Sequence, residues 1–177
     1  MRSVCSLFLF ICLLGGQVIL GEAVGGTDGS GQPGARHRPR TTAIFDHMAV
    51  INIRLTDDEG QVSAMEVKVA VRTDEHQAGF QYISPEVIEK SLILFVFPEE
   101  LITRFHMRNV EAPLDIAFIG SDGRILAIQE MQPDPGGNGS GLRTYGPNQP
   151  FRYVLEAPAG FFKDHRISAG KGWLLMR

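Results

Sequence analysis

The side chains best suited to chemistry gather in one short stretch, residues 105–131. His106, Arg108 and Asn109 lie close together there, and Asp115 follows inside an apolar segment. A guanidinium and an amide can bind a carboxylate or a sugar, and an imidazole can stack or titrate near neutral pH. Asp115 is the most informative of the four, because a carboxylate among apolar neighbours is costly unless it is paired or hydrogen-bonded.

Asp115 admits two interpretations. As a functional group, it is a general base or an acceptor for ligand hydroxyls, in a pocket at the mouth of a strand. As a structural group, it accepts hydrogen bonds from the Met107–Asn109 turn or pairs with Arg108. Arg108 and Asn109 either contact a ligand or hold their turn, and His106 either contacts a ligand or is solvated.

No complete reaction motif accompanies these residues. The sequence contains no Gly-x-Ser-x-Gly elbow, no His-Glu-x-x-His and no phosphate-binding Gly-x-x-x-x-Gly-Lys-Ser/Thr. The remaining histidines lack ligand spacing, so we expect neither a metal nor a cofactor. The net charge of −3 argues against nucleic acid, which needs clustered Lys and Arg.

The elements that must position these residues are mostly strands. Residues 114–119 predict a strand, Ser121-Asp122-Gly123 predicts a turn, and residues 124–131 return as the partner strand. Alternating apolar residues predict an earlier hairpin from 48–55 and 62–71. The continuously apolar segment 92–97 predicts a fully buried strand.

The remaining elements are short. Thr73 and Ser84 each predict the start of a brief helix, because a capping hydroxyl precedes acids or a proline. A strand is expected at 152–157, a short helix or turn at 159–163 and a last strand at 172–176, with a polar loop at 133–150. The predicted fold class is mainly β (α+β): a compact β-sandwich or partly closed barrel with two or three short helices.

The N-terminal region predicts the compartment. Residues 1–23 combine a positive start, an apolar stretch and a small-x-small pattern, which is typical of a signal peptide. Residues 24–40 predict a disordered linker, and 41–177 a single β-rich domain. Cys5 and Cys12 both lie in the signal segment, so an exported mature chain has no disulfide. We expect a periplasmic or secreted protein, tethered to the membrane only where the N-terminal segment is retained.

An ordered series of segments resembles one known family. The series is Val67-Lys68-Val69-Ala70 with Thr73, Gly79, Leu94-Phe95-Val96-Phe97, Phe105-x-Met107-Arg108-Asn109, Pro113 to Ile119, Asp122-Gly123, Tyr153-Val154-Leu155-Glu156 and Ala159-Gly160. It is similar to domain of unknown function 192, a family of small exported or membrane-tethered prokaryotic proteins. The similarity spans residues 66–170, about 60% of the chain.

The resemblance implies a compact β-rich fold of sandwich type and no established activity. Tyr145 matches a tyrosine of the family's long loop, which adds it to the candidate ligand-binding residues. His106 stands where the family usually has tryptophan, and Arg108 where it usually has lysine.

These observations favour an exported, non-catalytic domain that binds a small polar ligand or an envelope protein around residues 106–115, with the 133–150 loop as a lid. A second hypothesis is a hydrolase or lyase acting on a glycan or peptide, with Asp115 as base, Arg108 as electrophilic stabiliser and His106 as a candidate acid. A third is a structural accessory protein recognised through its sheet edge. The lack of a nucleophile set favours the first over the second.

Overall fold

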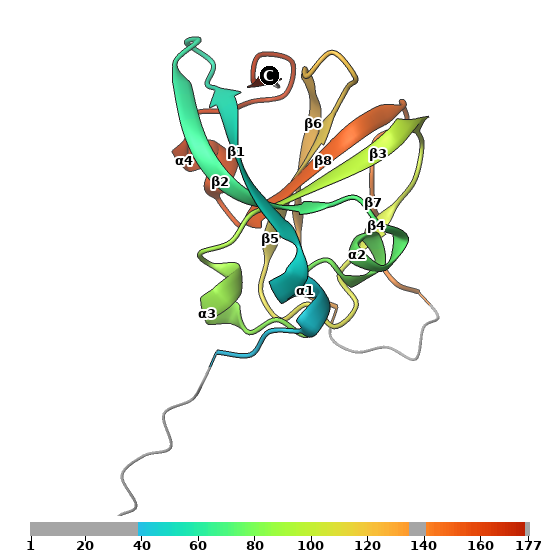
Figure 1. The fold of residues 1–177 in the computed structure, drawn as a ribbon. Coiled ribbons are helices and arrows are strands. Elements are labelled where there is room, and N and C mark those ends of the chain that lie inside the picture. Colours follow the sequence, from blue (N-terminus) through green and yellow to red (C-terminus); the bar gives the residue numbers. More distant parts are fainter. Residues whose placement is uncertain (1–38, 135–140, 176–177) are drawn as a thin grey trace, which may run out of the picture. The chain divides into compact units, whose positions relative to one another are not determined.

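The computed structural model describes residues 39–134 and 141–175, whose path is shown in Figure 1. The predicted signal peptide and most of the predicted linker lie outside these residues. The described part contains nine strands and four short helices, which confirms a mainly β fold. None of its helices is long and apolar enough to cross a membrane.

Seven strands form one curled sheet. They are β1 (Ala49–Thr56), β2 (Val62–Ala70), β3 (Ile93–Leu101), β5 (Leu114–Ile119), β6 (Ile125–Met131), β8 (Phe151–Pro158) and β9 (Trp173–Leu175). Their spatial order is β6-β5-β8-β3-β2-β1-β9, and only β2 and β3 run parallel. A separate antiparallel pair is formed by β4 (Phe105–His106) and β7 (Thr144–Tyr145).

The sheet curls until its two edges meet beside Gly123. The N–H of Leu174 donates to the Gly123 carbonyl at 2.7 Å, and the N–H of Ile125 donates to the Gly172 carbonyl at 3.0 Å. These bonds connect β9 with the start of β6. Of the two predicted architectures, the structure therefore has the partly closed barrel, in the form of a curled half-barrel.

The close approach at Gly123 predicts a measurable cost for any side chain there. A Cβ on Gly123 would lie 2.3 Å from the Leu174 carbonyl oxygen, and the backbone has a φ of +92°. We expect Gly123→Ala to lower the free energy of unfolding by about 2–3 kcal/mol, measured by urea denaturation. Gly60→Ala is the matched control, because Gly60 has a φ of +82° with open space around it. Equal losses in the two variants would contradict the edge contact.

The four helices are α1 (Ala43–His47), α2 (Thr73–Ala78), α3 (Pro85–Ile88) and α4 (Phe161–Asp164). The sequence predicted the last three, but not α1. Thr73 is the first residue of α2 rather than its cap, because Arg72 occupies the N-cap position. The Glu75 carboxylate accepts the N–H of Arg72 at 2.9 Å. The Ser84 hydroxyl accepts the N–H of Arg40 at 3.0 Å instead of capping α3.

Two apolar cores lie on the two faces of the sheet. One packs against α1, α3 and the β4–β7 pair, and the other fills the curl and includes Phe162 of α4. The central strands contribute to both: in β5, Ile116 and Phe118 face the first core, whereas Ala117 and Ile119 face the second. This division follows from the alternation of side chains along a strand, and it separates the candidate site residues.

Candidate functional site

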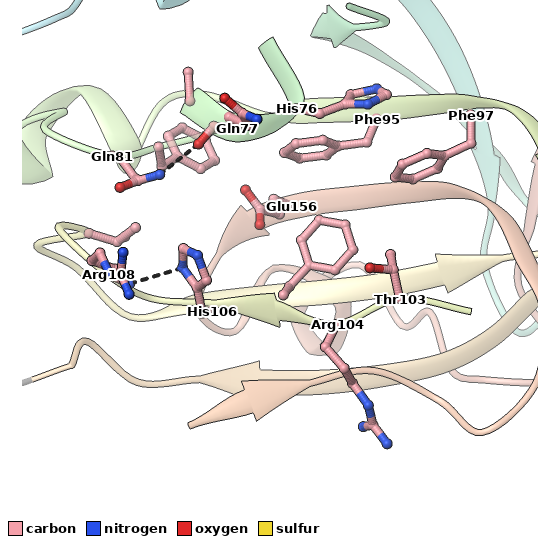
Figure 2. A pocket seen from close by; sticks show the side chains of 15 residues that line it. His76, Gln77, Gln81, Phe95, Phe97, Thr103, Arg104, His106, Arg108 and Glu156 are labelled. Atoms are coloured by element: carbon pink, nitrogen blue, oxygen red, sulfur yellow. Dashed lines mark hydrogen bonds between the residues drawn. The ribbon is translucent and has the colours of Figure 1, made fainter. Parts of the chain in front are cut away.

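A cleft of about 380 Å³ opens between α2 and β4, on the face of the sheet that carries α1 and α3. Figure 1 labels the two elements, and Figure 2 draws the side chains that line the cleft. Its lining comprises residues 76–81 on one side, residues 103–106, Arg108 and Val110 on the other, Phe95 and Phe97 from β3, and Glu156 from β8. Four phenylalanines thus line the cleft together with eight polar or charged side chains. Small-molecule sites combine apolar surface with convergent polar groups.

Glu156 occupies the floor of the cleft (Figure 2). It stands between Ile93 and Ile116 on the neighbouring strands, and the residue is only 6% exposed. Among residues 39–134 and 141–175, no hydrogen bond or ion pair engages its carboxyl group. Burial alone raises the pKa of Glu156 to about 8, so this acid keeps its proton at neutral pH.

Gly79 leaves the space in which this carboxyl group lies. The residue ends α2 with a φ of +46°, a conformation that favours glycine. A Cβ at this position would lie 3.6 Å from Glu156 Oε2 and 3.5 Å from the Phe95 ring. The helix end therefore approaches the acid closely without covering it.

Glu75 shows what a structural buried glutamate in this fold looks like. The residue is 2% exposed, and its Oε2 accepts the N–H groups of Val71 and Arg72, each at 2.9 Å. The Arg72 guanidinium lies 3.2 Å from its other oxygen. Hydrogen bonding from the Arg72 backbone and from Val71 lowers the pKa of Glu75 despite burial. Glu156 has no such partners, and this difference marks it as a group open to a ligand.

His106 and Arg108 stand at the rim of the cleft, as exposed residues of β4 and the following turn. The N–H of Arg108 donates to His106 Nδ1 at 3.4 Å, which leaves Nε2 of the neutral ring as a donor. The Arg108 guanidinium has no hydrogen bond or ion pair within the described residues. Both side chains are therefore free to contact an acceptor or an anion.

Asn109 and Tyr145 are engaged in the fold itself. Asn109 has a φ of +58° and donates from Nδ2 to the Tyr82 hydroxyl at 2.7 Å and to Gln81 Oε1 at 3.2 Å. Tyr145 is buried beside β4, and its hydroxyl accepts the N–H of Gln132 at 3.1 Å. Neither residue lines the cleft, and contact of either with a ligand stays a prediction.

Asp115 faces the other side of the sheet. It pairs with Ala157, one position beyond Glu156, so the two acids point to opposite faces. Burial raises the pKa of Asp115, and hydrogen bonding from the backbone N–H groups of Phe162 and Gly160 partly offsets this. The acid thus stabilises the start of α4. Its predicted partner was the turn around Arg108, but the structure provides α4 instead.

The predicted lid is described only at residues 133–134 and 141–150. Thr144 and Tyr145 pair with β4, and the Gly146 carbonyl accepts Arg104 Nη1 at 2.7 Å. This described part of the loop holds β4 in place and lines no part of the cleft. Arg104 is likewise occupied, because its Nη2 also contacts Asn148 Oδ1 at 3.1 Å.

Comparison with known proteins identifies the family. The model of the DUF192 family, described as an uncharacterized ACR, matches residues 54–173. The chain belongs to the DUF192 family. This confirms the resemblance seen in the sequence, and the matched range includes the whole cleft, from α2 to Glu156. No curated protein matches the chain.

Two solved structures are similar to this DUF192 domain. One, from Sinorhizobium meliloti, is provisionally described as a transcription regulator; it is 28% identical, with a TM-score of 0.62, over 72% of this chain and 94% of that one. The other, from Novosphingobium aromaticivorans, is a protein of unknown function; it is 21% identical, with a TM-score of 0.63, over 86% of this chain and all of that one. The second likeness concerns the fold alone.

Glu156 is the residue of this DUF192 domain that sequence reasoning missed as a site candidate. The signal was available, since Tyr153-Val154-Leu155-Glu156-Ala157 places an acid inside an apolar strand, as residues 114–119 do for Asp115. Strand alternation sets the face to which each acid points, and the helix beside that face decides the surroundings of the acid. Packing against α4 makes Asp115 a cap, and the cleft beside α2 leaves Glu156 open.

Proposed function

We propose that this exported DUF192 domain binds a small polar ligand, without catalysis, in the cleft between α2 and β4. One observation supports the proposal above all: the floor of a 380 Å³ cleft carries Glu156, a buried acid with no partner among the described residues. A buried polar group without a partner is costly to stability. Such a group is retained most readily where a ligand contacts it.

The rim supplies the second set of contacts. Arg108 offers up to five N–H donors to a carboxylate or another anionic group, and His106 Nε2 adds one more. Phe95, Phe97 and Phe105 provide apolar surface between the rim and the floor. A ligand of this site has a polar group at each end and an apolar or aromatic body.

The separation of Asp115 from Arg108 favours binding over the hydrolase or lyase hypothesis. That hypothesis requires the Asp115 carboxylate and the Arg108 guanidinium to act on one substrate. The acid lies on the opposite face of the sheet, beside α4, where the backbone N–H groups of Phe162 and Gly160 reach it. A general base must come within hydrogen-bonding distance of the proton it removes.

We also propose that the protein is exported and that an envelope protein is its alternative partner. Both parts of the proposal rest on the N-terminal sequence. A role in transcription, as in the description of the Sinorhizobium meliloti protein, receives no support from charge, because the whole chain carries a net −3.

Loss of binding in Arg108→Ala tests the proposed function. The isolated domain, residues 39–177, is screened by NMR against sugars, amino acids and short peptides, with the amides of Gly79 and Arg108 as reporters. We expect ligands that shift both amides, with an affinity 10- to 100-fold lower in Arg108→Ala because a charge-assisted hydrogen bond is lost. Arg143→Ala is the matched control, since this exposed arginine lies outside the cleft.

Two results would contradict the proposal. One is a library in which no compound shifts the cleft amides, and the other is equal affinity in Arg108→Ala and the wild type. Asp115→Asn decides the remaining question about the sequence-based site. Unchanged affinity removes Asp115 from the binding residues, and a loss of affinity places it among them.

A further inference from the structure

The buried end of the cleft has the chemistry of a cation site. Glu156 is the acid at its floor, and the ring of Phe95 lies beside it (Figure 2). Phe105 lines the same cleft. These two rings meet edge to face, with centroids 5.4 Å apart. Ring faces attract cations through their quadrupoles, and the attraction is strongest where water is excluded.

No lysine, arginine or histidine in the described part of the chain pairs with Glu156. His76, from α2, donates its Nε2 proton to the Ala70 carbonyl at 3.0 Å and packs against Phe97 with the rings tilted and their centroids 4.6 Å apart. Arg104 is held by the loop after β7, and His106 and Arg108 stand at the rim. No charged group among the described residues contributes to the pKa of Glu156, which burial alone raises. The negative charge that Glu156 can develop is therefore available to a ligand.

We propose that the Glu156 subsite receives a protonated amine, so that the ligand of this cleft is a small amphoteric molecule, with its ammonium group at Glu156 and an anionic group at Arg108. This inference rests on the proposed function and specifies the chemical class of the ligand. Short peptides and amino acids whose ammonium and carboxylate lie at opposite ends of an apolar body belong to this class. Neutral sugars do not.

Binding of the amine must release a proton. In the free domain at neutral pH the Glu156 carboxyl is protonated. When an ammonium enters, the proton leaves for the solvent, and a carboxylate–ammonium pair remains in the cleft. Affinity for an amine should therefore rise about tenfold per pH unit up to about pH 8 and then level off. The ammonium persists over this range, because an alkyl amine has a pKa near 10.

A series of four matched probes tests this inference: 2-phenylethylamine, 2-phenylethanol, phenylacetate and 4-(2-aminoethyl)benzoate, which carries its ammonium and carboxylate at opposite ends of the ring. Binding to the full chain is followed by NMR between pH 6 and pH 8.5. At pH 8 we expect the amine to bind at least tenfold more tightly than the alcohol, 4-(2-aminoethyl)benzoate to bind more tightly still, and phenylacetate to bind less tightly than the amine. The preference for the amine over the alcohol should shrink as pH falls.

Two variants assign the preference to its residues. Glu156→Gln keeps the size and hydrogen-bonding groups of the protonated acid and should lose both the preference for the amine and its pH dependence. Glu66→Gln, at an exposed position on β2, should retain both. Arg108→Ala should abolish the advantage of 4-(2-aminoethyl)benzoate over 2-phenylethylamine. As a measurement on the wild type, saturating 2-phenylethylamine should lower the pKa of the Glu156 carboxyl, followed by its ¹³C shift.

The outcomes separate this inference from the proposed function. If the alcohol or phenylacetate binds as tightly as the amine and depends on Arg108, the amine subsite is wrong and ligand binding in the cleft stands. A preference for the amine that persists in Glu156→Gln also overturns the inference. If none of the four probes shifts the cleft amides, the inference is overturned, and the library screen alone decides the proposed function.

Discussion

Glu156→Gln is expected to stabilise the domain at alkaline pH while leaving its stability at pH 4 almost unchanged. In the folded protein Glu156 keeps its proton up to about pH 8, whereas a glutamate with its ordinary value near 4.5 releases it much earlier. Between these two values the folded state binds more protons than the unfolded state. The contribution to stability is therefore complete below about pH 4.5 and is lost as the pH rises through 8.

The magnitude is large for a single titrating group. An interval from 4.5 to about 8 corresponds to at most about 5 kcal/mol, since each pH unit is worth about 1.4 kcal/mol. Glutamine has no charge to bury, so urea denaturation at pH 9 should give Glu156→Gln a free energy of unfolding higher than the wild type by several kcal/mol. Glu99→Gln, an exposed matched control, should follow the wild type. A constant difference between Glu156→Gln and the wild type across pH 4–9 would refute the buried, unpaired state of this acid.

Phe118→Ala is expected to lower the free energy of unfolding by about 3–5 kcal/mol, the range for loss of a fully buried phenylalanine. The Phe118 ring is inaccessible to solvent and lies between Phe105 at 5.8 Å and Phe151 at 5.0 Å, measured between centroids. Because Phe105 also lines the cleft, the cavity left by the ring lies next to the proposed site. Thermal and urea denaturation measure the loss.

An exposed apolar residue provides the control for this substitution. Ile102 is 59% exposed, and Ile102→Ala should change the free energy of unfolding by no more than about 0.5 kcal/mol. A similar small change in Phe118→Ala would mean that the cluster of rings does not support the sheet. We also expect Phe118→Ala to weaken any ligand of the cleft, because Phe105 loses one of its supports.

Most of the sheet could be predicted from local patterns. The Ser121-Asp122-Gly123 turn specified the β5–β6 hairpin, and alternation along residues 48–55 and 62–71 specified β1 and β2. The apolar run at 92–97 predicted a fully buried strand. A strand is present, but β3 is buried only from Ile93 to Phe95 and continues to Leu101. In each case the signal lies within a few residues of the element that it describes.

Elements that depend on distant partners could not be predicted in this way. The β4–β7 pair has two residues in each strand. It pairs Phe105–His106 with Thr144–Tyr145, two segments that are far apart in the sequence. The site shows the same limit. Asp115 and Glu156 carry the same signal, an acid in an apolar strand. Only the packing of α4 and α2 decides that Asp115 accepts backbone N–H groups of the helix start and that Glu156 lies open to the cleft.

The pKa of Glu156 in the ligand-free domain is the most direct test of the central claim, that this buried acid lies unpaired at the floor of the cleft. It can be measured by a ¹³C NMR titration of the side-chain carboxyl carbon, with Glu156→Gln used to assign the signal. We expect a value of about 8. A value at or below the ordinary 4.5 would show that a partner already holds the carboxylate, and it would contradict both the open floor of the cleft and the amine subsite built on it.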